Sequence, residues 1–336
     1  MKRLNEREII DLFTSKINDS LLDKVKNDDV VILPVRFGLL KRMNKTSNMS
    51  IVLKSDMLVE STDVVRIMKP WQIARKAILS CVSDFAAKGI RPYACLISIG
   101  IPKKYSRENI ASLATGFKQA SKEYNVHILG GDTNESKELI IDCNMMGITT
   151  LPDNKIPRRK GAQVGDLIVT SGKFGYTSSG LKIILSHLSA EKKFRTKSIS
   201  SVTFPKPQVE FGFRLAKYFS SSIDSSDGLS TSLYELIQKG KVDFLIDKIP
   251  IPHSLSHFAS LNFIKTEDLI FFGGEEYETI ATVPKQNFRK LIKDARKHGV
   301  RIYHIGQVVR GNGKLVYEIN GIRKIIRNQG FLHFAK

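Results

Sequence analysis

Hydrophobic residues recur along the chain with two spacings, one typical of helices and the other of strands. From Pro70 to Gly89 they recur every three or four residues, which predicts a helix that begins at the proline and ends before the glycine. The same spacing predicts helices at 5–17, 107–124, 178–187, 207–218, 230–239, 250–258 and 286–297. Short apolar or alternating runs predict strands at 30–33, 51–59, 93–99, 126–129, 139–149, 167–170, 242–246, 278–283 and 301–309.

Polar stretches between these elements predict loops and a domain boundary. Residues 151–160 hold two prolines and three consecutive basic residues, which is typical of a connector. We therefore expect two domains, 1–150 and 151–336, as the length of the chain also favours. The lysine-rich stretch 190–201 is predicted to be an exposed loop, and the Gly-Asn-Gly sequence at 311–313 a hairpin turn.

Composition narrows the class of protein. With 42% hydrophobic and 26% charged residues, the chain matches ordinary soluble globular proteins. It has no apolar run of about 18 residues that could span a membrane, and its first residues lack the apolar core of a secretory signal. Cys81, Cys95 and Cys143 stand singly among apolar residues, which favours buried, reduced thiols in a cytoplasmic protein.

The formal net charge of +20 is the most unusual bulk property. It has three candidate explanations: nucleic-acid binding, attraction of small polyanions, or a lysine-rich surface. The basic residues occur as short, dispersed pairs and triplets, without a long basic tail or a basic run interleaved with aromatic residues. We therefore expect a solvated basic surface with local attraction of phosphate, and no nucleic-acid partner.

Short acidic turns carry the candidate chemistry. The stretch from Asp224 to Gly228, with Asp227 inside it, follows a short apolar run and precedes a predicted helix. It brings carboxylates, hydroxyls and backbone N–H groups into one small volume, a combination that suits Mg²⁺ and phosphate. Taken alone, the stretch is more simply an Asx turn in which Asp227 caps the helix.

Further acidic residues stand in or near the ends of other elements. Asp84 lies late in a helix among residues expected to be buried, where a carboxylate needs either backbone N–H donors or a metal. Gly131 and Asp132 follow an apolar strand, in a Gly-Gly turn that lets the backbone approach a phosphate. Glu276 and Glu278 are expected on one side of an extended segment, either as a functional pair or as a solvated acidic edge.

Aspartates that met in one site would repel one another unless divalent cations were bound. Oxygen ligands favour Mg²⁺ or Mn²⁺ over zinc, and no Cys/His set competes with them. Such ions beside glycine turns are what phosphoryl transfer requires, because they bridge nucleotide phosphates and offset charge on the transferred group. The chain has neither a GxxxxGK[ST] loop nor the protein-kinase motifs. The candidate aspartates are Asp28, Asp29, Asp56, Asp84, Asp132, Asp224 and Asp227.

In the order and spacing of five motifs, the sequence resembles the thiamine-monophosphate kinase family, within the superfamily of aminoimidazole ribonucleotide synthetase. The motifs are Ser55–Val59, Ser83–Gly89, Gly130–Thr133, Asp224–Leu229 and Gly273–Glu278. The resemblance implies an α+β fold of two domains with mixed sheets and flanking helices. The first domain would bind ATP and Mg²⁺, the second would complete the active site, and the N-terminal sheet would pair across a homodimer.

The resemblance also implies a function: ATP-dependent phosphorylation of thiamine monophosphate to thiamine diphosphate by direct in-line transfer. Asp84, Asp132 and Asp227 would be catalytic. The Mg²⁺ ligands would be Asp29, Ser55, Asp56, Asp84, Asp132, Asp224 and Asp227. Contacts to ATP would come from Gly131, Asp132, Arg159 and Ser226, and contacts to thiamine monophosphate from Asp63, Glu275 and Phe331.

Three positions depart from the family pattern. Asn27 stands where a glycine is usual, Lys54 where a Ser or Thr is common, and Asp63 where a His lies near the substrate. With Lys54, one metal contact is lost or made by the backbone. Asp63 either faces the cationic ring of thiamine or signals another acceptor. The alternative functions are therefore an ATP-dependent relative with a different acceptor, and a non-catalytic nucleotide-binding regulator.

Overall fold

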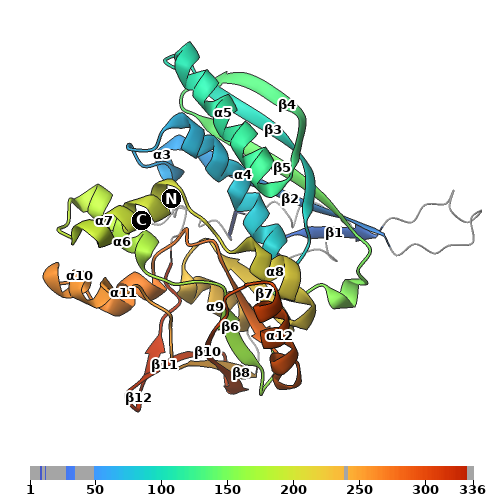
Figure 1. Cartoon of the computed structure of the whole chain (residues 1–336), viewed down its shortest axis with the longest axis vertical. Helices are drawn as coiled ribbons and strands as arrows, with labels where there is room; N and C mark the ends of the chain where they lie inside the picture. The colour runs from blue at the N-terminus through green and yellow to red at the C-terminus, as the bar shows by residue number, and fades with distance from the viewer. Residues whose placement is uncertain (1–7, 10–11, 13–27, 35–48, 238–240, 331–336) are drawn as a thin grey trace, which may run out of the picture.

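The computed structural model of the chain describes residues 8–9, 12, 28–34, 49–237 and 241–330, which contain two β-sheets with flanking helices (Figure 1). The first sheet is built from residues up to 149 and the second from residue 167 onward. The predicted mixture of helices and strands in two halves is confirmed. Asn27, Phe331 and most of the helix predicted at 5–17 lie outside the described residues.

The first sheet has five strands in the order β1-β2-β5-β3-β4, and only β3 and β4 pair in parallel. Helices α4 and α5 cover one of its faces, and the first hydrophobic core lies between these layers. The elements are β1 (Val31–Pro34), β2 (Ser50–Val59), α3 (Glu60–Asp63), α4 (Pro70–Ala87), β3 (Pro92–Pro102), α5 (Arg107–Tyr124), β4 (His127–Ser136) and β5 (Ile140–Thr149).

The other face of the first sheet carries the exposed apolar side chains of Leu53, Met57, Leu96 and Ile148, which the strand register places on this one face. Alternate residues of β2, such as Val52, are buried under the helices instead. Several large apolar side chains exposed on one sheet face are typical of an interaction surface.

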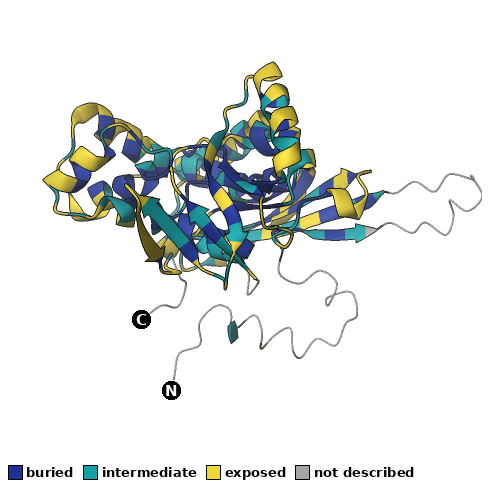
Figure 2. Cartoon of the chain, turned by 90° about the horizontal axis from the view of Figure 1, so that it is seen from below, coloured by how far each residue is buried: buried dark blue, intermediate teal, exposed yellow. Residues whose placement is uncertain are grey.

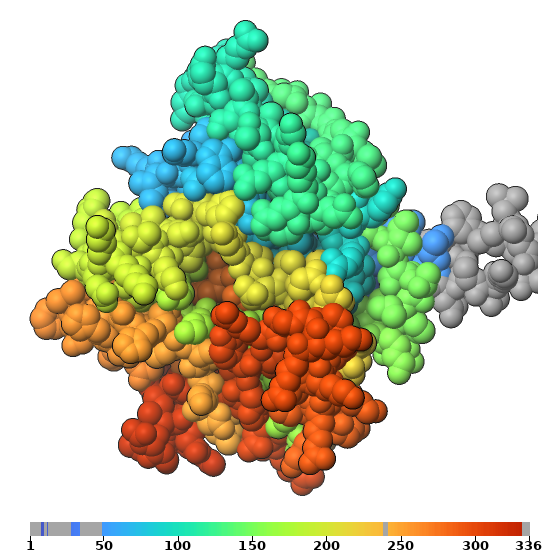
Figure 3. Space-filling model, in the orientation of Figure 1, coloured from blue at the N-terminus to red at the C-terminus, as the bar shows by residue number. Residues whose placement is uncertain are grey.

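Helix α4 is the central element of the molecule. Pro70 suits its first turn, where no N–H donor is needed. The helix packs on the first sheet and α5 on one side, and on α8, β7 and β9 of the second half on the other. Most of its residues are therefore buried, including Arg75 and Lys76, and so is Lys88, which follows it. Buried residues gather in the middle of the molecule (Figure 2), where the two halves are in broad contact (Figure 3).

The second sheet has seven strands in the order β12-β11-β8-β10-β6-β9-β7. Helices cover both of its faces: α6, α7, α9, α10 and α11 belong to one hydrophobic core, and α8 and α12 to another. No helix in the described ranges is long and apolar enough to cross a membrane. The elements are β6 (Leu167–Thr170), α6 (Tyr176–Ser186), α7 (Lys192–Thr203), α8 (Val209–Leu215), β7 (Ser221–Ser225), α9 (Leu229–Ile237), β8 (Val242–Ile246), α10 (Leu255–Leu261), α11 (Thr266–Phe271), β9 (Glu278–Val283), α12 (Lys285–Lys297), β10 (Tyr303–Arg310), β11 (Leu315–Ile319) and β12 (Ile322–Ile326), with short 3₁₀ helices at Asp153–Lys155 and Ala216–Tyr218.

Two sequence predictions about the second half are wrong. The stretch 190–201 is mostly helix α7, because Phe194, Ser198 and Val202 recur every four residues and are buried. The turn at 311–313 does not make a hairpin, since β8 lies between β10 and β11. The hairpin of this region joins β11 to β12 through Asn320 and Gly321.

Candidate active site

Three buried aspartates from distant parts of the chain converge where α4 meets the second sheet. Asp29 precedes β1, Asp84 lies near the end of α4, and Asp224 lies in β7. One carboxylate oxygen of each lies within 4.8 Å of those of the other two. We call these three residues the carboxylate cluster. Its members belong to three separate motifs, and the packing of α4 against β7 brings them together.

Asp29 is held by two cations. Lys88 Nζ lies 2.9 Å from a carboxylate oxygen of Asp29 and 2.6 Å from one of Asp28, and it donates a 2.8 Å hydrogen bond to the carbonyl of Ser222. Arg159 Nε donates to Asp29 at 2.5 Å. Burial by itself raises the pKa of Asp29, but Lys88 and Arg159 outweigh it and hold that pKa below its usual range. Asp29 is therefore a charged carboxylate in a fixed position.

Asp84 and Asp224 lack comparable compensation. Burial raises the pKa of Asp84, and the carboxylates of Asp224 and Asp29 add to this effect against the Lys54 ammonium, which lies 2.7 Å away. Asp224 accepts a 3.0 Å hydrogen bond from Ser83 Oγ, yet burial and Asp29 raise its pKa to about 6. Adjacent carboxylates with raised pKa values favour the binding of a cation.

The donor set fits a divalent metal ion. Asp56 shares the helix-covered face of β2 with Lys54, and its carboxylate lies 3.8 Å from the Lys54 ammonium, which also contacts Asp84. Carboxylate oxygens are the ligands that Mg²⁺ and Mn²⁺ prefer. Asp29, Asp56, Asp84 and Asp224 are the residues that would hold the ion.

Two of the predicted metal ligands, Ser55 and Asp132, lie away from the carboxylate cluster. The Ser55 side chain is exposed on the opposite face of the first sheet and donates to Asp142 at 2.9 Å. Asp132 is exposed in β4, in register with Ser98 and Asp142 on that same face. Three strand spacings separate β4 from β2, roughly 14 Å. One copy of the chain therefore does not bring Asp132 into the carboxylate cluster.

Gly131 and Asp132 do not form the predicted turn, because the whole stretch 127–136 is strand β4. A Cβ atom at Gly131 would lie 1.7 Å from the carbonyl oxygen of Ile97 in β3. The glycine therefore permits close pairing of the two strands. The close approach of β4 to β3 is sufficient to explain a glycine at position 131, and a contact to phosphate is not needed to explain it.

A bend between β7 and α9 is present as predicted, but Asp224 and Ser225 belong to the strand. Ser226 and Asp227 are exposed in the bend before the helix. Gly228 has a φ of 110°, and a Cβ atom there would lie 2.7 Å from the carbonyl oxygen of Gly273, so the position requires glycine. The close approach lets the backbone N–H of Glu275 donate to the Ser226 carbonyl at 2.6 Å. Two of the sequence motifs thus meet at this turn.

The acidic segment after Gly274 is not extended as predicted, because Glu275 and Tyr277 both have positive φ. Glu276 is buried, so it does not form a solvated edge. Glu278 begins β9 and accepts a hydrogen bond from Ser171 Oγ. Burial raises the pKa of Glu278 to about 7, against the opposing effect of that hydrogen bond.

Lys76 joins two of the predicted substrate contacts. Its buried ammonium donates to the backbone carbonyl of Asp63 at 2.7 Å and to the carboxylate of Glu275. The Asp63 carboxylate itself accepts from the N–H of Val59 at 2.7 Å. Neither Lys76 nor Lys88 was among the predicted site residues, although a cation in or just after a helix that is apolar on nearly every side signals a buried anionic partner.

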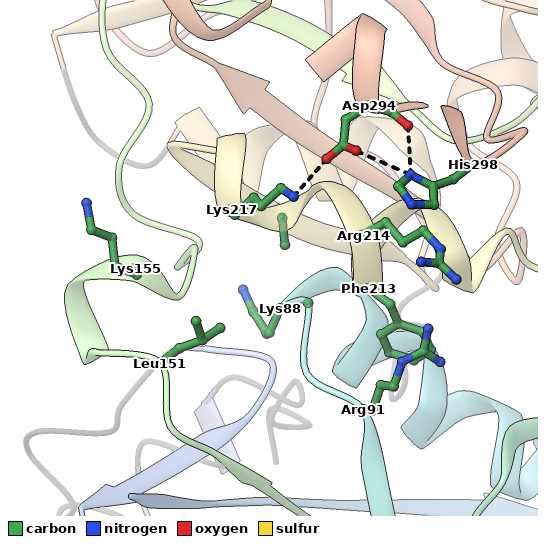
Figure 4. A pocket seen from close by; sticks show the side chains of 11 residues that line it. Lys88, Arg91, Leu151, Lys155, Phe213, Arg214, Lys217, Asp294 and His298 are labelled. Carbon is green, nitrogen blue, oxygen red and sulfur yellow. Dashed lines mark hydrogen bonds and ion pairs between the residues drawn. The ribbon is translucent and has the colours of Figure 1, made fainter. Parts of the chain in front are cut away.

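A cavity of about 380 Å³ is lined by Lys88 together with Lys217, Asp294 and His298 (Figure 4). The carboxylate of Asp294 lies 2.7 Å from Lys217 Nζ and 3.3 Å from His298 Nδ1. None of the clustered aspartates lines it. The cavity is thus separate from the candidate active site.

Comparison with known proteins identifies the family. The AIR synthase related protein family matches with its N-terminal domain at 27–149 and its C-terminal domain at 163–318. A thiamine-monophosphate kinase of Nitrosopumilus maritimus is 38% identical, covering 99% of this chain and 100% of that protein. One of Pyrococcus horikoshii is 31% identical, covering 93% and 91%. The chain belongs to the thiamine-monophosphate kinase family.

Solved structures agree with this assignment. AaThiL complexed with AMPPCP and TMP superposes with a TM-score of 0.81 at 26% identity, covering 99% of both chains. A thiamine monophosphate kinase from Aquifex aeolicus gives 0.76 at 25% identity, covering 94% of this chain and 100% of that one. The resemblance expected from the motifs, the two-domain fold class and the assignment as a kinase are thereby confirmed.

In this kinase, Lys88→Met should lower the free energy of unfolding by about 3–5 kcal/mol, because it leaves buried Asp29 without its closest ammonium. Denaturant unfolding measures the loss. The control Lys217→Met removes an exposed Lys–Asp pair of 2.7 Å and should cost less than about 1 kcal/mol. Equal losses in the two variants would contradict a compensating role for Lys88.

Glu278 should make the stability of the kinase depend on pH. Its folded pKa of about 7 exceeds the ordinary 4.5, so the folded state holds a proton that the unfolded state releases between these values. Stability from this group therefore falls as the pH rises from about 4.5 to 7. In Glu278→Gln this fall should shrink by about 2 kcal/mol. Denaturant unfolding of both proteins in chelator at pH 5, 6, 7 and 8 measures this difference. Parallel plots of unfolding free energy against pH for the two proteins would contradict the role of Glu278.

Proposed function

We propose that this kinase phosphorylates thiamine monophosphate to thiamine diphosphate by direct in-line transfer from ATP. The observation that carries the proposal is the convergence of Asp29, Asp84 and Asp224 in a buried cluster that suits divalent metal ions. Relatives named thiamine-monophosphate kinase cover nearly the whole chain, and the AaThiL structure holds TMP beside AMPPCP, an analogue of ATP. These findings support both substrates.

We propose several Mg²⁺ ions as the cofactor. When bound, they would offset the negative charge of the phosphates during transfer. The chain prepares this site by holding Asp29 charged between Lys88 and Arg159. Asp227 is proposed as a further ligand, since it is exposed in the bend that follows Asp224.

The residues assigned to ATP and to the acceptor lie around the same turn. The exposed Ser226 and the guanidinium of Arg159, whose side chain is 25% exposed, are proposed to contact ATP. Glu275 and Asp63 are proposed to contact thiamine monophosphate, with Lys76 holding the two segments together. Phe331, which is also proposed to contact thiamine monophosphate, lies outside the described residues.

We propose a homodimer that completes the site. Within the described residues, β4 is an edge strand, and β1 pairs only with Ser50–Leu53, so the remainder of β2 is also a free edge. Free edges beside an exposed apolar face favour pairing with a second copy. If β4 of one subunit paired along β2 of the other, Asp132 would come next to the strand that carries Asp56 of the other subunit. This arrangement would reconcile Asp132 as a ligand and Gly131 as an ATP contact with their distance from the cluster.

Purified protein with ATP and Mg²⁺ should convert thiamine monophosphate to the diphosphate. Asp84→Asn and Asp227→Asn should each lower kcat by about 100-fold or more, because each removes a carboxylate from the metal site. Glu318→Gln, which alters only an exposed pair with Arg323, should leave the rate unchanged. Chromatography of the products measures these rates.

The same assay separates the alternatives. ATP consumption with another phosphate acceptor, and no thiamine diphosphate, would replace the proposed acceptor but keep the chemistry. Near-normal rates in both aspartate variants would contradict the metal-dependent mechanism.

Complementation tests the shared site. Asp132→Asn and Asp84→Asn homodimers should both be nearly inactive. After random mixing of subunits, half of the dimers would be mixed, and each mixed dimer would hold one intact site, so activity should recover to about one quarter of wild type. Light scattering gives the oligomeric state in parallel. No recovery from a preparation shown to contain mixed dimers would place Asp132 outside the partner's site.

A further inference from the structure

Lys54 places an ammonium group among the carboxylates. It lies two residues before Asp56 on the same face of β2, so both side chains point toward α4. Its Nζ lies 2.7 Å from an oxygen of Asp84 and 3.8 Å from one of Asp56. The Lys54 side chain is 21% exposed and that of Asp84 only 6%, so this ion pair is not an ordinary surface pair.

The Lys54 ammonium contacts a different carboxylate from the other two cations of the site. Lys88 and Arg159 contact Asp29, whereas among the described residues the cation that pairs with Asp84 is Lys54. An N–O distance of 2.7 Å means that the ammonium fills the space beside this Asp84 oxygen. A divalent ion bound to this oxygen on the same side would compete with the ammonium for that space.

We propose that Lys54 is a built-in cation that takes the place of one divalent ion in this centre. The chain would then bind one metal ion fewer per site than it would with a neutral side chain at this position. The inference rests on the proposed function, because it requires Asp84 and Asp56 to be metal ligands. Lys54 is here a positioning residue, which acts through the carboxylates it holds.

Two physical consequences follow. Removal of the ammonium leaves Asp84 buried without a cation, so the metal-free protein loses stability. It also frees carboxylate oxygens and space, so a further divalent ion binds. The competing behaviour is that the flexible lysine side chain swings out of the site whenever metal binds, in which case the number of ions would not depend on it.

Counting bound Mn²⁺ distinguishes these behaviours. Full-length wild type, Lys54→Ser and Lys54→Arg are titrated with Mn²⁺ in the presence of AMPPCP, and free Mn²⁺ is measured by electron paramagnetic resonance. Lys54→Ser should bind one more Mn²⁺ per chain than wild type, while Lys54→Arg, which keeps the charge, should match wild type. The control Lys217→Ser, which removes an exposed Lys–Asp pair of the same length, should also match.

An equal count in Lys54→Ser and wild type would overturn the inference while leaving the proposed metal site intact. No Mn²⁺ bound by any of the proteins would overturn the metal site itself, and the inference with it. If Lys54→Ser does not fold, Lys54→Met, which keeps an apolar stem of similar length, takes its place in the count.

Thermal unfolding gives a second readout that does not require activity. In chelator, Lys54→Ser should melt below wild type, and Mg²⁺ should raise its melting temperature by more than it raises that of wild type. Lys217→Ser should show the Mg²⁺ response of wild type. A Lys54→Ser protein with an unchanged melting temperature in chelator and an unchanged Mg²⁺ response would contradict the role of Lys54.

Discussion

Buried carboxylates need positive charge close to them, and the junction between the two halves of this kinase is organised by that requirement. Lys88 provides the clearest case, because its ammonium binds Asp28 and Asp29 and also the carbonyl of Ser222 in the second sheet. A single side chain thus neutralises a residue of the carboxylate cluster and joins the two halves. Asp84 and Asp224 are less well compensated, and this imbalance favours the binding of a cation.

Helix α4 makes this arrangement possible because it is buried on nearly every side. A helix with solvent on one face would place its charged residues there, but α4 packs between two sheets and other helices. Its polar side chains must therefore find partners inside the protein: Ser83 and Lys76 find them in the second half, and Asp84 pairs with Lys54 of β2. The residues proposed to meet substrates, Ser226 and Asp227, lie by contrast in an exposed bend.

The two sheets differ in how completely they are covered, and this difference bears on function. Helices cover both faces of the second sheet, so each face is buried in a hydrophobic core. The first sheet keeps one apolar face and two strand edges uncovered among the described residues. Asp132 lies on the uncovered face of the first sheet, so the proposed dimer would both bury apolar surface and complete the active site.

The sequence by itself determined the elements whose signals are local, together with the family. Helices α4 and α5 have the predicted spacing, and a bend with Gly228 at positive φ precedes α9, because periodicity and turn chemistry depend on neighbouring residues. Only the tertiary structure decided that Asp29, Asp84 and Asp224 meet while Asp132 stands on the opposite face of the sheet. Strand order and ion pairing connect residues that are far apart in the chain, so they cannot be predicted from the pattern of neighbouring residues.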